Sequence, residues 1–284
     1  MRSHSAALVA LHVSVILFGF AGLFGKWLTL SPTIIVLGRT VVAAATLAAI
    51  MLSQRRAIGR PDLSLAINGL ILALHWVAFF LAIQIATVAI GLLGFATFPL
   101  FVLALERVAL GRHFSVTEGA TAIAVCAGLV LLVPDFSWSN PTLQGLAWGV
   151  LSGFTFALLA VRNRARVQRD GALALALWQN AFAAFYLVPW VLTFEASALT
   201  LSARDIVLLI VLGAVCTALA HSLFIASMRR LTAHTASIIA ALEPVYGIAL
   251  AALLLGEYPD GRTLVGAGLI IFAAGLASRR ALAG

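Results

Sequence analysis

Apolar runs follow one another along the whole chain, and only short polar links separate them. Each run has close to the roughly 20 residues that a helix needs to cross a hydrocarbon core about 30 Å thick. Strands of a membrane barrel would instead alternate polar and apolar residues over about 10 positions. The pattern therefore predicts an all-α integral membrane protein.

The composition argues against a water-soluble fold. Hydrophobic residues make up 63% of the chain and charged residues only 10%, whereas soluble domains carry about 25% charged residues. A net charge of +8 would suggest nucleic acid as a partner of a soluble protein. Here the basic residues lie in the short links, so membrane topology explains them better and we expect no nucleic-acid partner. Cys126 and Cys216 fall within apolar runs, which favours packing residues over a disulfide framework.

The runs predict ten transmembrane helices, at residues 7–28, 33–52, 64–83, 88–105, 118–133, 143–161, 172–194, 206–228, 235–255 and 263–278. The links between them are rich in Pro, Gly, Asp and Asn, the residues that form turns. The first run lacks a clean small-residue cleavage site, so we expect a retained helix and not a removed signal peptide.

The basic residues are unevenly distributed over the two sides that these spans define. Fourteen arginines lie on the side that holds both termini, whereas Lys26, Arg204 and Arg262 lie on the other side. Cytoplasmic loops carry an excess of Lys and Arg, so both termini are predicted to be cytoplasmic.

Two stretches of the chain, 83–111 and 228–256, match each other at an offset of 145 residues. The ordered matches are Thr87 with Thr232, Ala96 with Ala241, Pro99 with Pro244, and Leu110-Gly111 with Leu255-Gly256. Each half holds an odd number of predicted spans, so the second half must enter the membrane from the opposite side. Inverted halves of this kind are the plan of many secondary transporters.

With these motifs the chain resembles the EamA-type branch of the drug/metabolite transporter superfamily. The resemblance covers two five-helix repeats, 7–133 and 143–278, within one transmembrane domain that spans 1–284. Glu257 closes the second motif where Arg112 stands in the first, which puts a role for a symmetric acidic pair in doubt. Within the family the chain is most similar to bacterial exporters of amino acids, including aromatic ones.

The resemblance implies a multi-pass secondary transporter of the bacterial inner membrane. It would export small amphipathic metabolites by alternating access around a central cavity between the inverted repeats. The partners that we expect are a small-molecule substrate and the lipid bilayer, and the chain is expected to act as a monomer.

Pro99 and Pro244 lie near the middle of their spans, where each removes one helical hydrogen bond and kinks the helix. They predict a pair of bent helices that frame the substrate site, or static kinks used for packing. Gly145, Gly149 and Gly153 form a ridge of small residues that favours close helix packing.

Two ionisable residues, Glu243 and Arg39, lie well inside predicted spans and away from the span ends. Glu243 precedes Pro244, and a carboxyl group at such depth usually faces a bundle interior or a water-filled path. It could exchange a proton or bind a substrate ammonium group, or merely bond to a neighbouring helix. Arg39 could bind a substrate carboxylate or anchor its helix, and the alternative is that it reaches the interface by snorkelling.

The remaining candidates are His75 and Trp76 in the third span and His221 in the eighth. Histidine can donate or accept hydrogen bonds to a zwitterionic ligand, although a lone histidine is as well explained by bonding within the bundle. Phe79 and Tyr246 are expected to add to an aromatic cavity wall. Phe80, Phe154 and Trp148 are further candidates for this wall.

Several classes of function lack support in the sequence. There is no Walker motif and no protease or metal constellation, so we expect no nucleotide, no cofactor, no metal and no enzymatic activity. Two alternatives to an amino-acid exporter stay open. One is a multidrug exporter of lipophilic cations with Glu243 as the counter-charge, and the other is a non-transporting membrane scaffold or an intramembrane enzyme.

Overall fold

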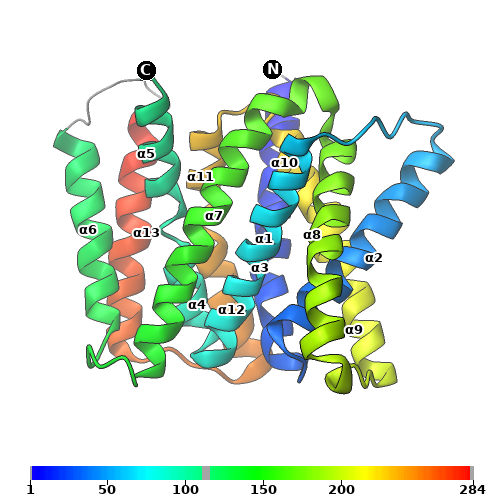
Figure 1. Cartoon of the computed structure of the whole chain (residues 1–284). Coiled ribbons are helices and arrows are strands. Elements are labelled where there is room, and N and C mark those ends of the chain that lie inside the picture. The colour runs from blue at the N-terminus through cyan, green and yellow to red at the C-terminus, as the bar shows by residue number, and fades with distance from the viewer. Residues whose placement is uncertain (1, 111–115, 282–284) are drawn as a thin grey trace.

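A computed structural model describes residues 2–110 and 116–281, and within these ranges the chain forms helices and no strands. The helices run side by side along one direction, as Figure 1 shows. In chain order they are α1 (Arg2–Trp27), α2 (Pro32–Ser53), α3 (Leu63–Ile85), α4 (Val88–Phe95), α5 (Phe98–Leu110), α6 (Val116–Leu132), α7 (Pro141–Asp170), α8 (Ala172–Phe194), η1 (Ala196–Ala198), α9 (Ala203–Gly213), η2 (Ala214–Leu219), α10 (Ala220–Ser227), α11 (Ala233–Ala240), α12 (Glu243–Leu255) and α13 (Gly261–Ala281).

Eight helical segments of the described chain are long and apolar enough to cross a membrane. Three of them combine consecutive elements, namely α4 with α5, α9 with η2 and α10, and α11 with α12. Two shorter apolar segments, Gly119–Leu132 of α6 and Gly261–Ala273 of α13, belong to helices that pack against each other. The all-helical membrane class is thus confirmed, while the count of ten spans stays a prediction.

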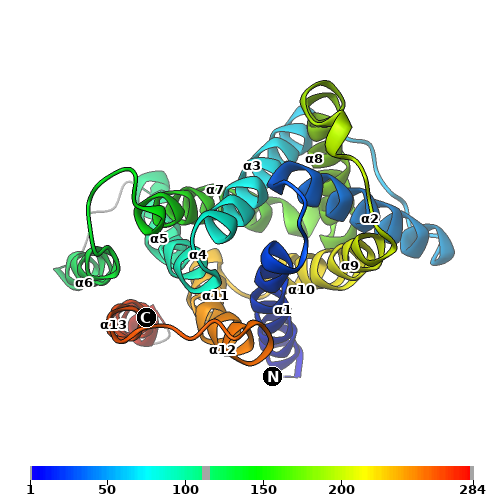
Figure 2. The ribbon, with the colours of Figure 1, turned by 90° about the horizontal axis from the view of Figure 1, so that it is seen from below.

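The arrangement of the helices brings distant parts of the chain together. Both described ends lie at the same end of the bundle, at the top of Figure 1. Seen from below in Figure 2, α6 and α13 stand to one side, while α1, α3, α4, α7 and α10 surround the middle. Long helices from the first and second parts of the chain pack directly on each other, including α3 on α7, α2 on α8 and α1 on α12.

Side-chain caps explain where several of these helices begin. The side-chain oxygens of Ser31, Asp62, Asn140 and Ser202 accept hydrogen bonds from backbone N–H groups in the first turns of α2, α3, α7 and α9. Such bonds satisfy donors that have no partner within the helix. Single polar residues between the apolar runs therefore determine where these helices start.

Helix α7 is longer than predicted, because it continues beyond residue 161 to Asp170. The basic residues assigned to a loop instead bind neighbouring helices. Arg162 donates to the side chains of Asn68 and Ser64, and Arg166 forms ion pairs at 2.7 Å with both Asp62 and Asp170. The hydrogen bond from Arg166 lowers the pKa of Asp62 to about 2. These contacts hold the last turns of α7 against α3, and the basic residues alone did not predict them.

The two spans that contain Pro99 and Pro244 are broken rather than merely kinked. Helix α4 ends at Phe95 and α5 begins at Phe98, while α11 ends at Ala240 and α12 begins at Glu243. In each case the proline is the second residue of the second helix, where its missing N–H leaves no helical bond unmade.

Glycines let some helices cross with their backbones in contact. A Cβ atom added at Gly94 of α4 would lie 2.9 Å from the Cα atom of Gly149 in α7. A Cβ atom added at Gly19 of α1 would lie 2.9 Å from the backbone nitrogen of Gly247 in α12. Both crossings therefore require the absence of a side chain, as the small-residue ridge of α7 predicted for that helix.

Candidate functional site

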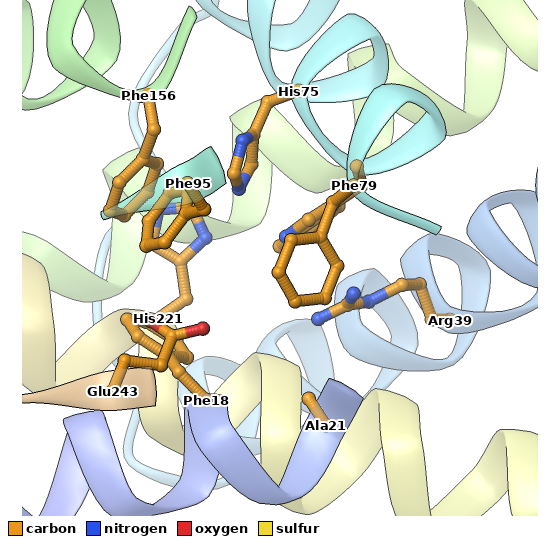
Figure 3. Close-up of a pocket in the computed structure, with 10 residues that line it drawn as sticks. Phe18, Ala21, Arg39, His75, Phe79, Phe95, Phe156, His221 and Glu243 are labelled. Carbon is orange, nitrogen blue, oxygen red and sulfur yellow. The ribbon is translucent and has the colours of Figure 1, made fainter. Parts of the chain in front are cut away.

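A small cavity lies in the middle of the bundle, next to the break between α11 and α12 (Figure 3). Its volume is about 20 Å³, which is room for about one water molecule. The lining residues include a cation, a carboxyl group, two imidazoles and five aromatic rings, and they are Arg39, Glu243, His75, His221, Phe18, Trp76, Phe79, Phe95 and Phe156, together with Ala21.

Arg39 of α2 is held in place by a ring and a hydroxyl group. Its guanidinium carbon lies 3.9 Å from the centroid of the Trp76 ring, close enough for a cation–π interaction. Its Nε donates a hydrogen bond of 3.0 Å to Oγ1 of Thr217. Only 1% of Arg39 is exposed, so the side chain does not snorkel to the surface in this structure.

The partner of Arg39 lies in an irregular part of its span. Thr217 belongs to the π-helical turn η2, and its hydroxyl donates 2.7 Å to the carbonyl oxygen of Leu212 five residues earlier. Turns of this type occur frequently at functional sites. Here the extra residue of the π turn places a hydroxyl against the guanidinium group.

Glu243 is the first residue of α12, directly after the break, and it is 2% exposed. Figure 3 shows Glu243 and Arg39 entering the cavity from opposite sides. No ion pair joins these two side chains, and Oε2 of Glu243 has no hydrogen-bond partner among the described residues. The cavity thus holds a guanidinium group and a carboxyl group that are not paired with each other.

The two histidines differ in their bonding. Nδ1 of His75 lies 3.0 Å from the carbonyl oxygen and 2.9 Å from the hydroxyl oxygen of Ser152, so it can donate to the carbonyl or accept from the hydroxyl according to its tautomer. The His75 ring also stacks on Phe156 with centroids 4.7 Å apart. His221 has no partner for either ring nitrogen within the described chain, and its ring is T-shaped to that of Trp76, with centroids 5.7 Å apart.

Aromatic rings from four helices form the rest of the wall. Phe156 of α7 lies near the centre of this cluster, with centroid distances of 5.6 Å to Phe95 and 6.1 Å to Phe18. Phe79 contacts Phe95 at 6.0 Å. The wall can therefore offer π faces and apolar surface to a ligand, beside the guanidinium group of Arg39 and the carboxyl group of Glu243.

The structure brings together most of the residues that the sequence singled out. Arg39, His75, Trp76, Phe79, His221 and Glu243 all line the cavity. Their part in transport stays a prediction, because the geometry gives their positions and not their roles.

Other sequence candidates lie elsewhere. Tyr246 is only partly buried and packs beside Gly19 of α1, outside the cavity lining. Phe154 is 38% exposed and packs on Phe101, so it is no part of the wall. Phe80 is fully buried, and its ring centroid lies 5.3 Å from the Arg39 guanidinium carbon, but it does not line the cavity. Trp148 does not line the cavity either.

Sequence reasoning missed three rings, Phe18, Phe95 and Phe156. A signal existed for two of them. Phe95 lies four residues before Pro99, at the break of its span, and Phe156 lies one turn after Gly153 on the glycine ridge of α7. Phe18 had no such marker.

Comparisons with known proteins agree with this architecture. The model of the EamA-like transporter family matches residues 5–133 and 143–279. A Bacillus subtilis (strain 168) protein named "Uncharacterized transporter YxxF" is 24% identical over 97% of this chain and 90% of its own length. A Salmonella typhimurium (strain LT2) protein named "Probable amino-acid metabolite efflux pump" is 27% identical over 53% of each chain.

A solved crystal structure supports the fold. It superposes with a TM-score of 0.74 at 18% identity and covers 98% of both chains. Because the family model matches two stretches that together cover most of the chain, the protein belongs to the EamA-like transporter family and is a multi-pass membrane transporter.

Proposed function

We propose that the protein exports small zwitterionic metabolites, with amino acids including aromatic ones as the favoured class, across the bacterial inner membrane. The observation that supports the proposal is that Arg39 and Glu243 line the same buried cavity, which has an aromatic wall. An α-carboxylate suits the guanidinium group, which presents a fixed fork of donors. An α-ammonium group suits the Glu243 carboxylate, and an aromatic or aliphatic side chain suits the surrounding rings.

A relative supports the same class of substrate. The Salmonella typhimurium protein that matches half of this chain has a name that assigns it to efflux of amino-acid metabolites. The cavity of this chain has the chemistry that such a cargo needs, namely one cation, one carboxyl group and apolar surface. Lipophilic cations fit less well, because Arg39 would repel them.

Transport by alternating access accounts for the closed state of the cavity. A volume of about 20 Å³ is far below the roughly 300 Å³ at which ligand pockets begin. Entry of an amino acid therefore requires helices to move apart on one side of the bundle. The two broken spans, α4–α5 and α11–α12, would supply the moving parts as inverted counterparts of a ten-span transporter.

The proposed orientation places both termini in the cytoplasm. The excess of fourteen arginines over three basic residues supports it, as does the position of both described chain ends at one end of the bundle (Figure 1). Cysteine accessibility labelling in intact cells tests this directly. Labelling of an engineered cysteine near either terminus from the outside would contradict the orientation.

Flux into proteoliposomes tests the substrate class. Labelled tryptophan, phenylalanine and methionine are expected to move, whereas methyl viologen is expected to move at the rate of protein-free vesicles. Flux of methyl viologen without amino-acid flux would favour the multidrug alternative. Absence of flux for every solute would contradict the exporter proposal.

A further inference from the structure

A second cavity lies at the end of the bundle where both described termini are found. Its volume is about 460 Å³, and it lies between the first turns of α1, the end of α10 and the end of α7. The walls on α1 are the small side chains of Ala6, Ala7 and Ala10. Larger residues at these positions would fill the space, so the groove depends on the alanines.

Two adjacent guanidinium groups supply the charge. Arg229 and Arg230 follow α10, line the groove and are exposed. Neither side chain has a hydrogen bond or ion pair within the described residues. The turn that carries them is held by α7, because Nε2 of Gln168 donates a hydrogen bond of 2.7 Å to the carbonyl oxygen of Arg229. The groove thus presents two free cations on a fixed turn.

An exposed apolar stripe on α1 continues from the groove. On α1, the exposed residues Ala6, Val9 and Val13 recur at helical spacing and lead away from the groove. The helix α10, by contrast, has no exposed residue between Ala220 and Ser227. An acyl chain could follow the α1 stripe while its headgroup stays at the arginines.

We propose that this groove binds an anionic phospholipid, with the phosphate-bearing headgroup between Arg229 and Arg230 and an acyl chain along α1. The shape and charge agree with the basic pockets between transmembrane helices that recognise anionic headgroups. The acyl-chain stripe favours a lipid over a soluble phosphate. This site is separate from the central cavity and needs no role for Glu243 or Arg39.

Lipid titration of the purified full-length protein in neutral detergent tests the proposal. Native mass spectrometry would count bound dioleoyl phosphatidylglycerol and dioleoyl phosphatidylcholine. We expect one tightly retained phosphatidylglycerol and clearly weaker retention of phosphatidylcholine. Exchange of Arg229→Gln and Arg230→Gln together should weaken phosphatidylglycerol binding by about 30-fold, since each arginine near an anionic lipid contributes about a fivefold factor.

A matched control is the exposed pair Arg55 and Arg56, which follows α2 and does not line this groove. Arg55→Gln with Arg56→Gln should leave binding unchanged, and an equal loss would show general surface attraction and overturn the proposal. Ala10→Trp, which fills the groove without changing its charge, should also abolish retention. Unchanged retention in this variant would place the lipid elsewhere.

Two further measurements test whether the ligand is a lipid or a soluble anion, and whether lipid binding is independent of the proposed transport. Inorganic phosphate and glycerol 3-phosphate at millimolar concentration should not displace the lipid, and full displacement would indicate a soluble-anion site. Glu243→Gln should bind phosphatidylglycerol as the native chain does. A failure of the exporter proposal would therefore leave this result intact, and the reverse also holds.

Discussion

The two broken spans share one backbone plan. In each, a threonine caps the first half-helix, with Thr87 Oγ1 accepting from Ile90 N at 3.2 Å and Thr232 Oγ1 accepting from Thr235 N at 3.0 Å. The first half has 8 residues and the second has 13 in both spans. The matching threonines and prolines of the sequence repeat are therefore the residues that start, interrupt and restart the helix.

The side chains at the two breaks differ in kind. Position 98, the first of α5, holds a fully buried phenylalanine, whereas the matching position 243, the first of α12, holds a carboxyl group. The residue that ends the first half-helix is Phe95 in one span and Ala240 in the other. One break thus supplies a ring to the cavity and the other supplies its carboxyl group. Shared backbone residues locate the site, and unshared side chains determine its chemistry.

The largest effect on amino-acid flux is expected for Glu243→Gln, and Phe98→Leu at the matching position is its control. Loss of the carboxylate should lower amino-acid flux in proteoliposomes at least about tenfold, because a bond to a charged group contributes about 1.5–3 kcal/mol. Phe98→Leu keeps an apolar side chain and should cost less than about 1.5 kcal/mol in stability, with flux within a few-fold of native. Equal losses of flux would mean that the two breaks do not differ in function.

A second test concerns the charge opposite Glu243. Arg39→Lys keeps the positive charge but loses the planar fork and the Nε bond to Thr217. The apparent affinity for tryptophan should fall by about tenfold, in line with about 1–2 kcal/mol for a desolvated cation–π contact and a hydrogen bond. Competition by tryptamine, which has no carboxylate, should change little. A parallel loss for tryptamine would remove the carboxylate role of Arg39.

The shared caps should behave alike. Thr87→Ala and Thr232→Ala should each destabilise the protein by about 1 kcal/mol, the usual contribution of an N-cap. Thermal unfolding in detergent measures this, with Thr87→Ser and Thr232→Ser as controls that keep the hydroxyl. A large effect at only one of the two positions would show that the matching threonines do not play matching structural roles.

The smallest effect concerns the helices that precede the broken spans. Helix α9 begins with its own capping box of Ser202 and Asp205, whereas Asp62 of α3 also binds Arg166 of α7. Because the pKa of Asp62 is lowered to about 2, its contribution is present above about pH 4 and is lost as the pH falls through about 2. Asp62→Asn should be less stable than the native chain by under about 1 kcal/mol near pH 7, since the pair is exposed.

Melting curves from pH 7 downward measure this difference. It should shrink between about pH 4 and pH 2, the range set by the ordinary and the lowered pKa of Asp62. A difference that stays constant with pH would show that the ion pair with Arg166 contributes nothing to stability.

The sequence predicted the membrane class, the starts of most helices and the charged residues of the cavity. Glu243 and Arg39 could be predicted because an ionisable group inside an apolar run usually faces the bundle interior or a cavity. Phe18 and the outward position of Tyr246 could not be found, because both lie in helices that are apolar on most faces. In such a helix no hydrophobic periodicity fixes the rotation about its axis, and packing decides which ring faces inward. The break at each proline was underestimated for a related reason, since a proline does not specify whether the helix bends or restarts.

The glycine crossings determine which helices can travel together. Where Gly94 meets Gly149 and Gly19 meets Gly247, no side chain stands between the backbones that could change rotamer and fill a gap. Parting these helices would leave bare surfaces that lose their dispersion contacts. We therefore expect α4 to stay fastened to α7, and α1 to α12, during any opening of the cavity. Each rigid unit that moves would then consist of one helix from the first part of the chain and one from the second.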